Sequence, residues 1–206
     1  MKKTPKIALT ISTRIGVAAL VAATLTCLVA CARQEGASQG GAGATTGVSG
    51  ASVGTGAPAS DFNARDIEGK NVKLSTYLGN QVVLLNFCAT WCEPCVAEFP
   101  HLRKMYEANK AKGFIILAIA MDGPETVANV PAFARRNQLN FPMLTDEDSR
   151  IASLYNPKKS APLSVLIDKS GKVVAIREGY NPGDEEFLAK DVAKAIDGIA
   201  RENAPQ

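Results

Sequence analysis

Apolar residues after residue 61 occur in segments whose spacing predicts β-strands. The segments 82–87 and 114–121 are almost continuously apolar, which is typical of central strands buried on both faces of a sheet. Shorter apolar segments beside turn sequences predict two hairpins and one lone strand: 62–66 with 72–74, 163–167 with 173–177, and 141–144. In the second hairpin, Gly171 supplies the positive φ that its turn requires.

Helical spacing of apolar residues follows most of these strands. It predicts helices over four segments: 92–112, 125–138, 148–155 and 184–199. Pro131 lies inside the second helix and predicts a kink there. Asp148 gives the third helix an acidic start, and Asp184 is expected to cap the last one. Strands that alternate with helices and end in a hairpin predict an α/β sandwich with a mixed sheet.

The N-terminus has the composition of an export signal. Residues 1–14 are basic and contain no acid, and residues 15–30 are apolar but short for a membrane-spanning helix. This segment ends in Leu28-Val29-Ala30-Cys31, which resembles a bacterial lipobox. We therefore expect 1–30 to be a lipoprotein signal peptide and Cys31 to be lipidated. An ordinary secretory signal and an uncleaved anchor are the alternatives, and all three place the domain outside the cytoplasm, on the periplasmic side.

The next segment is almost wholly Gly, Ala, Ser, Thr and Val, so residues 31–60 are predicted to be a flexible tether. The predicted folded domain is 61–200, and 201–206 form a flexible tail. The net charge of +3 arises from the leader: without its four basic residues, 23 − 4 = 19 basic residues face 20 acidic ones. A nearly neutral mature chain gives no electrostatic reason to expect nucleic-acid binding.

Candidate chemistry is concentrated in the stretch Trp91-Cys92-Glu93-Pro94-Cys95, between a buried strand and a helix. Cys92 is expected at the helix N-terminus, where free backbone N–H groups stabilise a thiolate. Pro94 suits a first helical turn. Cys95, one turn later, can close a short disulfide with Cys92 and can resolve a mixed disulfide. The pattern predicts a redox-active Cys92–Cys95 disulfide that carries out thiol–disulfide exchange.

Two plainer interpretations compete with this one. A structural zinc site needs four ligands, whereas the mature chain offers four cysteines, one of them expected to carry lipid, and the single His101. A purely structural disulfide is the other alternative, because cysteines outside the cytoplasm usually pair. We expect no metal and no cofactor.

Further motifs accompany the cysteines, namely Glu98-Phe99-Pro100, Phe141-Pro142 and Ala161-Pro162. Together with the cysteine motif they resemble the TlpA/ResA-like thioredoxin family over about residues 61–199. The resemblance implies a thioredoxin-like fold, with a central mixed β-sheet flanked by helices, an N-terminal β-hairpin and a helical insert. It also implies a thiol-disulfide oxidoreductase that reduces disulfide-containing exported proteins such as apocytochrome c. Its electron donor would be a membrane protein of the CcdA/DsbD kind, and the protein is expected to be a monomer.

The resemblance assigns roles to residues outside the cysteine pair. Pro162 is expected to be cis, and Ala161 before it to expose backbone groups to an extended substrate. Glu98 is expected near the thiols as a proton acceptor for Cys95, although its helix position alone also fits a solvated carboxylate. Asn86 stands where many thioredoxins have a buried Asp, and its amide is expected to satisfy local hydrogen bonds.

Four more residues near the cysteines invite interpretation. Glu93 places negative charge beside Cys92, which disfavours a very acidic thiol and favours a reductase. Trp91 is expected either to pack beside the disulfide and shape a docking surface, or to pack in the core. Cys88 is expected to be a buried, inert thiol. His101 is expected on the surface of the active-site helix.

Other functions are possible on the same fold. A copper-handling protein of the Sco kind uses Cys-X-X-X-Cys and a distal His, whereas this chain has shorter spacing and no distal His. A thiol peroxidase of the peroxiredoxin kind uses a Pro-x-x-x-Thr/Ser-x-x-Cys box, which the sequence lacks. An oxidase or isomerase would use the same exchange chemistry at a different redox potential.

Overall fold

The computed structural model of the chain describes residues 53–202, with side chains as far as residue 198. The predicted signal peptide 1–30, Cys31, the tether up to residue 52 and residues 203–206 of the predicted tail lie outside the described residues. Within the described range, no helix combines the length and the apolar character needed to cross a membrane.

Strands and helices alternate along the described residues, as predicted. The strands are β1 (Asn63–Arg65), β2 (Asn71–Lys73), β3 (Val82–Cys88), β4 (Phe114–Ala120), β5 (Met143–Thr145), β6 (Leu163–Ile167) and β7 (Val173–Glu178). The α-helices are α1 (Glu93–Asn109), α2 (Val130–Arg136), α3 (Arg150–Tyr155) and α4 (Asp184–Glu202). Short 3-10 turns are η1 (Leu74–Thr76), η2 (Lys110–Lys112) and η3 (Val127–Asn129).

The main sheet has five strands in the order β5-β4-β3-β6-β7, so β3 lies at its centre. Strands β3, β4 and β5 are parallel, whereas β6 is antiparallel to both β3 and β7. The sheet is therefore mixed. Strands β1 and β2 form a separate antiparallel hairpin. This architecture confirms the expected thioredoxin-like fold with an N-terminal hairpin.

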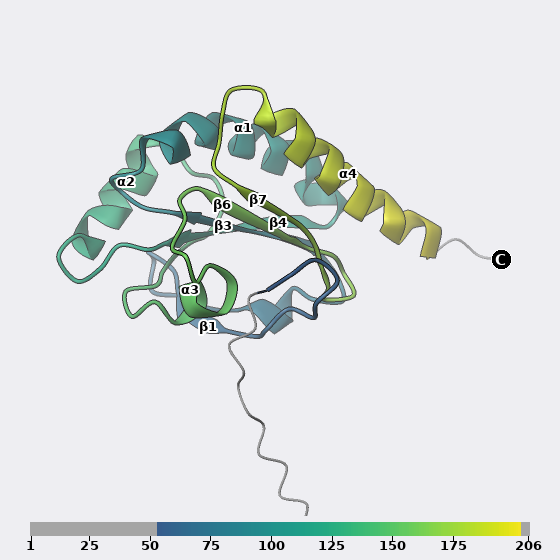
Figure 1. Ribbon diagram of the computed structural model, residues 1–206, viewed down its shortest axis with the longest axis horizontal. Helices are drawn as coiled ribbons and strands as arrows, with labels where there is room; N and C mark the ends of the chain where they lie inside the picture. Colours follow the sequence, from purple (N-terminus) through teal and green to yellow (C-terminus); the bar gives the residue numbers. More distant parts are fainter. Residues whose placement is uncertain (1–52, 203–206) are drawn as a thin grey trace, which may run out of the picture. The chain divides into compact units, whose positions relative to one another are not determined.

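Helices cover both faces of the main sheet, which explains why every residue of β3 and β4 is buried. Helices α1 and α4 lie over one face, and α3 and the β1–β2 hairpin lie over the other (Figure 1). Successive side chains of a strand point to opposite faces. Leu84 of β3 accordingly belongs to the core cluster beneath α1 and α4, and Leu85 belongs to the cluster on the opposite face.

Two helix starts differ from their prediction. Pro131 lies in the first turn of α2, where a missing N–H costs no helical bond, so it helps begin a helix rather than kinking one. Helix α3 begins at Arg150 with no acidic residue in its first turn. Its free N–H groups are capped instead by the buried Asp146, which accepts from the N–H groups of Ile151 at 2.9 Å and Ala152 at 2.7 Å.

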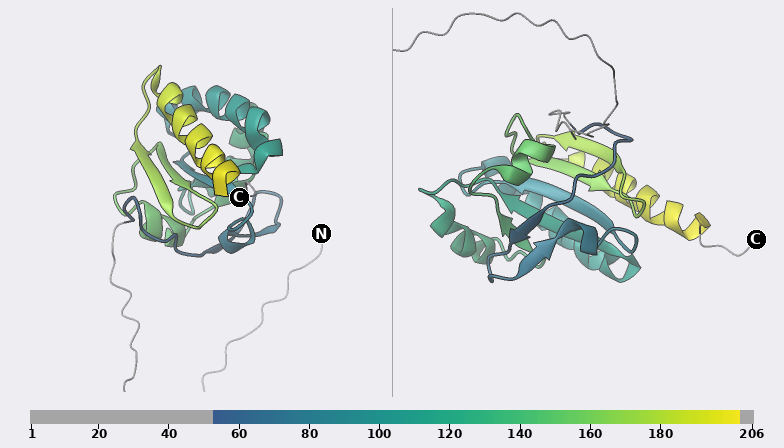
Figure 2. Two further views of the ribbon diagram at one scale, coloured as in Figure 1. Left: turned by 90° about the vertical axis from the view of Figure 1, so that its right-hand side faces the viewer. Right: turned by 90° about the horizontal axis from the view of Figure 1, so that it is seen from below.

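Backbone pairing with the domain begins before residue 61, the predicted boundary. The N–H of Gly56 donates to the carbonyl of Val173 at 2.7 Å, and the N–H of Ala59 donates to that of Gly171 at 2.7 Å. In the right-hand view of Figure 2, this dark blue segment lies beside the yellow-green strands. Residues 56–59 are therefore part of the folded unit and not of a free tether.

Candidate active site

The two cysteines of the motif lie at the start of α1 and form a disulfide, with their Cα atoms 5.3 Å apart. Cys92 is the N-cap of the helix, and its Sγ accepts a hydrogen bond from the N–H of Cys95 at 3.2 Å. Pro94 lies in the first turn, where it costs no hydrogen bond. The helix start therefore presents its unpaired N–H groups to the sulfur of Cys92, as the sequence predicted.

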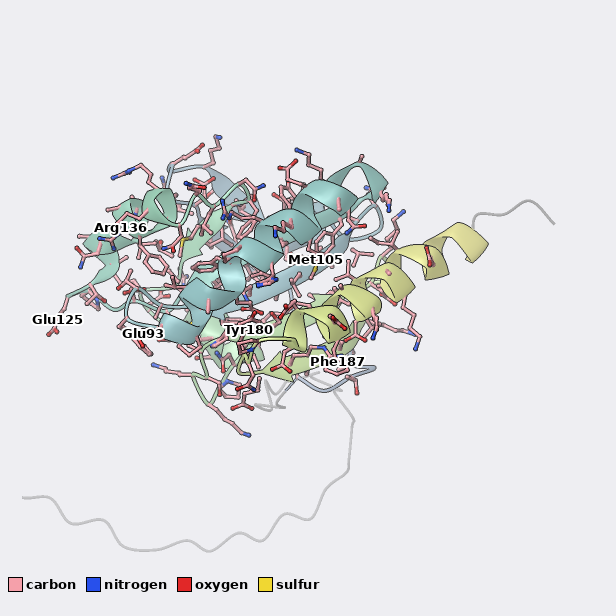
Figure 3. All side chains as sticks on the ribbon, turned by 90° about the horizontal axis from the view of Figure 1, so that it is seen from above. Glu93, Met105, Glu125, Arg136, Tyr180 and Phe187 are labelled. Atoms are coloured by element: carbon pink, nitrogen blue, oxygen red, sulfur yellow. A yellow bond between two sulfur atoms is a disulfide. The ribbon has the colours of Figure 1, made fainter. Side chains whose placement is uncertain are left out.

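The two cysteines differ slightly in exposure. Cys92 retains 4% of its surface exposed, whereas Cys95 retains none. The neighbouring Glu93 is exposed in the first turn of α1, at the point labelled in Figure 3. Both cysteines are therefore buried in the disulfide form, and Cys92 alone of the two keeps some exposed surface.

The turn between β3 and α1 is held by a buried carboxylate that sequence reasoning missed. Asp122, which follows β4, accepts hydrogen bonds from the N–H of Thr90 at 3.0 Å and from its hydroxyl. The turn is closed by a bond of 3.1 Å from the N–H of Cys92 to the carbonyl of Ala89. The sequence offers one signal for this contact. Asp122 directly follows a predicted buried strand, so it lies at the same end of the parallel strands as the cysteines.

Glu98 points into the protein, so the interpretation as a solvated carboxylate was wrong. It is 5% exposed, and its Oε2 accepts a hydrogen bond of 3.0 Å from Nδ2 of Asn86. Nδ2 of Asn86 also donates to Ser164 at 3.1 Å, across the β3–β6 pair, whereas its buried Oδ1 has no partner among the described residues. The predicted hydrogen bonding of this amide is therefore met at its nitrogen only. Burial raises the pKa of Glu98 to about 7, and the charge of Asp184 adds to this, while the Asn86 bond opposes it.

A polar cavity of about 250 Å³ lies against Glu98, and Tyr180, Asp184 and Leu188 are among its lining residues. Figure 3 looks onto α1 and α4 and shows Tyr180 between them. His101 of α1, half-exposed as a helix-surface residue, lies 3.4 Å from a carboxylate oxygen of Glu185 on α4. Glu98 is thus buried on the side of Asn86 and faces an opening on the side of α4.

The peptide bond between Ala161 and Pro162 is cis, as predicted. Leu163, the next residue, pairs with Phe87 of β3, so Pro162 lies at the same end of the sheet as the cysteines. The carbonyl of Pro162 accepts from the N–H of Gly179 at 2.8 Å, which fixes this loop against the end of β7.

Trp91 and Cys88 complete the surroundings of the disulfide. Trp91 is 65% exposed, so the alternative of core packing was wrong, and Val96 on α1 is a second exposed apolar residue. Cys88 is fully buried and forms no disulfide, as expected. Burial raises the pKa of its thiol, and the charges of Asp122 and Glu98 raise it further, so the thiolate is strongly disfavoured.

A disulfide at a helix start, together with a cis-proline at the same end of the sheet, is typical of a thioredoxin-like redox site. Comparison with known proteins agrees with this class. The AhpC/TSA family matches residues 55–176. The thiol-disulfide oxidoreductase ResA of Bacillus thuringiensis subsp. konkukian is 38% identical over 137 residues, which cover 66% of this chain and 77% of the relative. ResA of Bacillus subtilis is 36% identical over 128 residues, or 62% and 69% of the two chains.

Solved structures show the same fold. The thiol:disulfide interchange protein DsbE from Chlorobium tepidum superposes with a TM-score of 0.65 and 34% identity, covering 70% of this chain and 99% of the other. A secreted disulfide oxidoreductase of Mycobacterium tuberculosis has a TM-score of 0.55 and 26% identity, with coverage of 65% and 95%. The chain belongs to the AhpC/TSA family and to the ResA-like thioredoxins that its motifs resembled.

Proposed function

We propose that this thiol-disulfide oxidoreductase is a reductase of disulfides in exported proteins. The observation that carries the proposal is the Cys92–Cys95 disulfide: the sulfur of Cys92 caps α1, and Cys92 keeps slight exposure while Cys95 keeps none. That asymmetry assigns attack on the client to Cys92 and release of the client to Cys95.

The reaction starts from the reduced protein. The Cys92 thiolate attacks one sulfur of a client disulfide, the client S–S bond breaks, and a mixed disulfide forms while the other client sulfur leaves as a thiolate. Cys95 then loses its proton and attacks the Cys92 sulfur. The second client thiolate leaves, and both client thiolates take protons from water. The client has gained two electrons, and the Cys92–Cys95 disulfide must be reduced by a dithiol donor.

Glu98 is the proton acceptor for Cys95 in this proposal. It lies one helical turn after Cys95, it is buried, and its pKa is raised to about 7, so an appreciable fraction is ionised near neutral pH. Asn86, which bonds to Glu98 on the other side, has an amide that cannot take up a proton. Glu98 therefore serves as the proton acceptor in place of a carboxylate on β3.

The client binds across the exposed surface near Cys92. Trp91 offers an exposed aromatic face, and Ala161 and Pro162 lie at the same end of the sheet. An extended client segment would pair with the backbone of Ala161 and pack on Trp91. Glu93 keeps the Cys92 thiolate from extreme stabilisation, which supports reduction rather than oxidation of clients.

We further propose that the protein works outside the cytoplasm, attached to a membrane through lipid on Cys31. The sequence motif at 28–31 and the similarity to a secreted mycobacterial disulfide oxidoreductase support an extracytoplasmic location. A membrane protein of the CcdA/DsbD kind would then supply electrons, and apocytochrome c would be one client of the required type.

The test is a client trap. In the variant Cys95→Ala, the mixed disulfide on Cys92 cannot resolve, so non-reducing electrophoresis and mass spectrometry should find exported proteins linked to Cys92. The double variant Cys92→Ser with Cys95→Ala is the matched control and should capture none. The proposal fails if Cys95→Ala yields no linked protein, or if the reduction potential equals that of the strongest known oxidants.

A further inference from the structure

The hydrogen-bond ladder between β3 and β4 is continued by a side chain at the point where the strands end. The last backbone bond runs from the N–H of Met121 to the carbonyl of Cys88 at 2.9 Å. Beyond it, β3 leaves the sheet to become the turn before α1. The carboxylate of Asp122 then accepts the N–H of Thr90 at 3.0 Å and the hydroxyl of Thr90 with its other oxygen.

Asp122 has no exposed surface, and a buried carboxylate is costly unless hydrogen bonds compensate for its lost hydration. Both of its side-chain bonds in the described part of the chain come from Thr90. Thr90 is therefore held at its backbone and at its side chain by one fixed group. The bond from the N–H of Cys92 to the carbonyl of Ala89 spans Thr90, so fixing Thr90 fixes the turn that leads to Cys92.

We infer that Asp122 is a positioning residue for Cys92, and that it acts through Thr90. By holding the turn, it keeps the sulfur of Cys92 on the N–H of Cys95, 3.2 Å away. The inference rests on the proposed exchange at Cys92. A helix N-terminus stabilises a thiolate only within its first turn, so a loosened turn would leave the Cys92 thiolate less stabilised and less abundant at a given pH.

The experiment compares Thr90→Val with Thr90→Ser in the reduced full-length protein. Valine keeps the shape and the N–H but removes the hydroxyl, whereas serine keeps both donors. The rate of alkylation of Cys92 by iodoacetamide is measured against pH by mass spectrometry of the peptide that carries this residue. In Thr90→Val, we expect the midpoint of the alkylation rate against pH to lie about one pH unit higher than in the wild type. Below that midpoint, Cys92 should react about tenfold more slowly. In Thr90→Ser, the rate should stay within about twofold of the wild type.

Asp146 provides the matched control for a general loss of stability. It is also a buried carboxylate with two hydrogen bonds, but its partners are the N–H groups of Ile151 and Ala152 in α3. Asp146→Asn should lower the unfolding temperature without slowing the alkylation of Cys92. If it slows alkylation as much as Thr90→Val does, the effect is one of stability and the inference is wrong.

A double-mutant cycle tests the link between the two residues. In an Asp122→Ala background, Thr90→Val should change the alkylation rate by less than about twofold, because its partner is already gone. An unchanged tenfold effect in that background would overturn the inference, as would a Thr90→Val variant that reacts as fast as Thr90→Ser. Should Asp122→Ala not fold, the valine and serine variants decide alone. Alkylation needs no client, so the result stands even if the client trap fails.

Discussion

Glu98 and Asp122 are both buried carboxyl groups beside the central strand β3, but their surroundings differ. Glu98 accepts one neutral amide N–H from Asn86 and faces a polar cavity of about 250 Å³. Asp122 is bonded on both oxygens by Thr90. The first arrangement leaves a carboxyl group that can take up and release a proton. The second leaves one that is occupied with holding the backbone. Burial alone therefore does not assign a role to a carboxyl group. The hydrogen-bond partners of its two oxygens do.

The largest effect is expected for the proton-transfer half of this comparison. Glu98→Gln should slow the resolving step about a hundredfold, because the amide cannot accept the proton of Cys95. In the wild type, the rate of this step should rise with pH around a midpoint near the Glu98 pKa of about 7, since ionised Glu98 is the acceptor. Single-turnover reduction of a model protein disulfide by stopped flow measures both quantities.

The matched variant for this measurement is Asp122→Asn, which changes the other buried carboxyl group in the same way. In this variant the rate of the resolving step should still rise with pH around a midpoint near 7, because Glu98 is intact. A Glu98→Gln variant that keeps the wild-type pH profile would remove the distinction between the two groups.

Glu98 should also make stability depend on pH. Its pKa is raised in the folded protein from 4.5 to about 7, so between these values the folded state holds a proton that the unfolded state has released. The free energy of unfolding should therefore fall as pH rises from about 4.5 to above 7, by up to about 3 kcal/mol. Urea unfolding of the oxidised protein at pH 5 and pH 8 measures this difference. Glu98→Gln should flatten it, and an equally steep fall in that variant would show that another group is responsible.

A smaller effect is expected for Trp91, the exposed residue that follows Thr90 in the turn held by Asp122. Trp91→Ala should raise KM for a protein disulfide about tenfold, because an exposed aromatic next to the reactive sulfur is an expected binding anchor. The rate with a small disulfide such as cystine should hardly change. Phe187→Ala is the control, since Phe187 is similarly exposed but lies on α4. An equal rise in KM in both variants would argue against a docking role for Trp91.

Local patterns predicted those parts of the fold that local physics determines. The continuous apolar runs of β3 and β4, the turn at Gly171 and the start of α1 at the cysteine motif all follow from neighbours in the sequence. The kink predicted at Pro131 was wrong because a proline suits a first helical turn and disrupts only an interior one, and the apolar spacing does not show where α2 begins.

The features that the sequence left open depend on contacts between distant residues. The burial of Glu98 depends on Asn86 twelve positions earlier and on the covering of this face by α4, and the spacing within α1 contains neither. The role of Asp122 is not visible in its local sequence because its partner, Thr90, is 32 residues away. Only the parallel pairing of β3 with β4 brings the two together, since it places the ends of both strands at one edge of the sheet.

The place where the chain joins the domain has a consequence for how the protein meets its clients. Residues 56–59 pair beside Gly171 and Val173. Val173 pairs with Ile167, which pairs with Val83 at the beginning of β3, whereas the sulfurs follow the end of that strand. The described chain therefore enters the domain at the end of the sheet opposite to the disulfide, so the entry segment and the reactive cysteines occupy different ends of the folded unit and do not compete for the same surface.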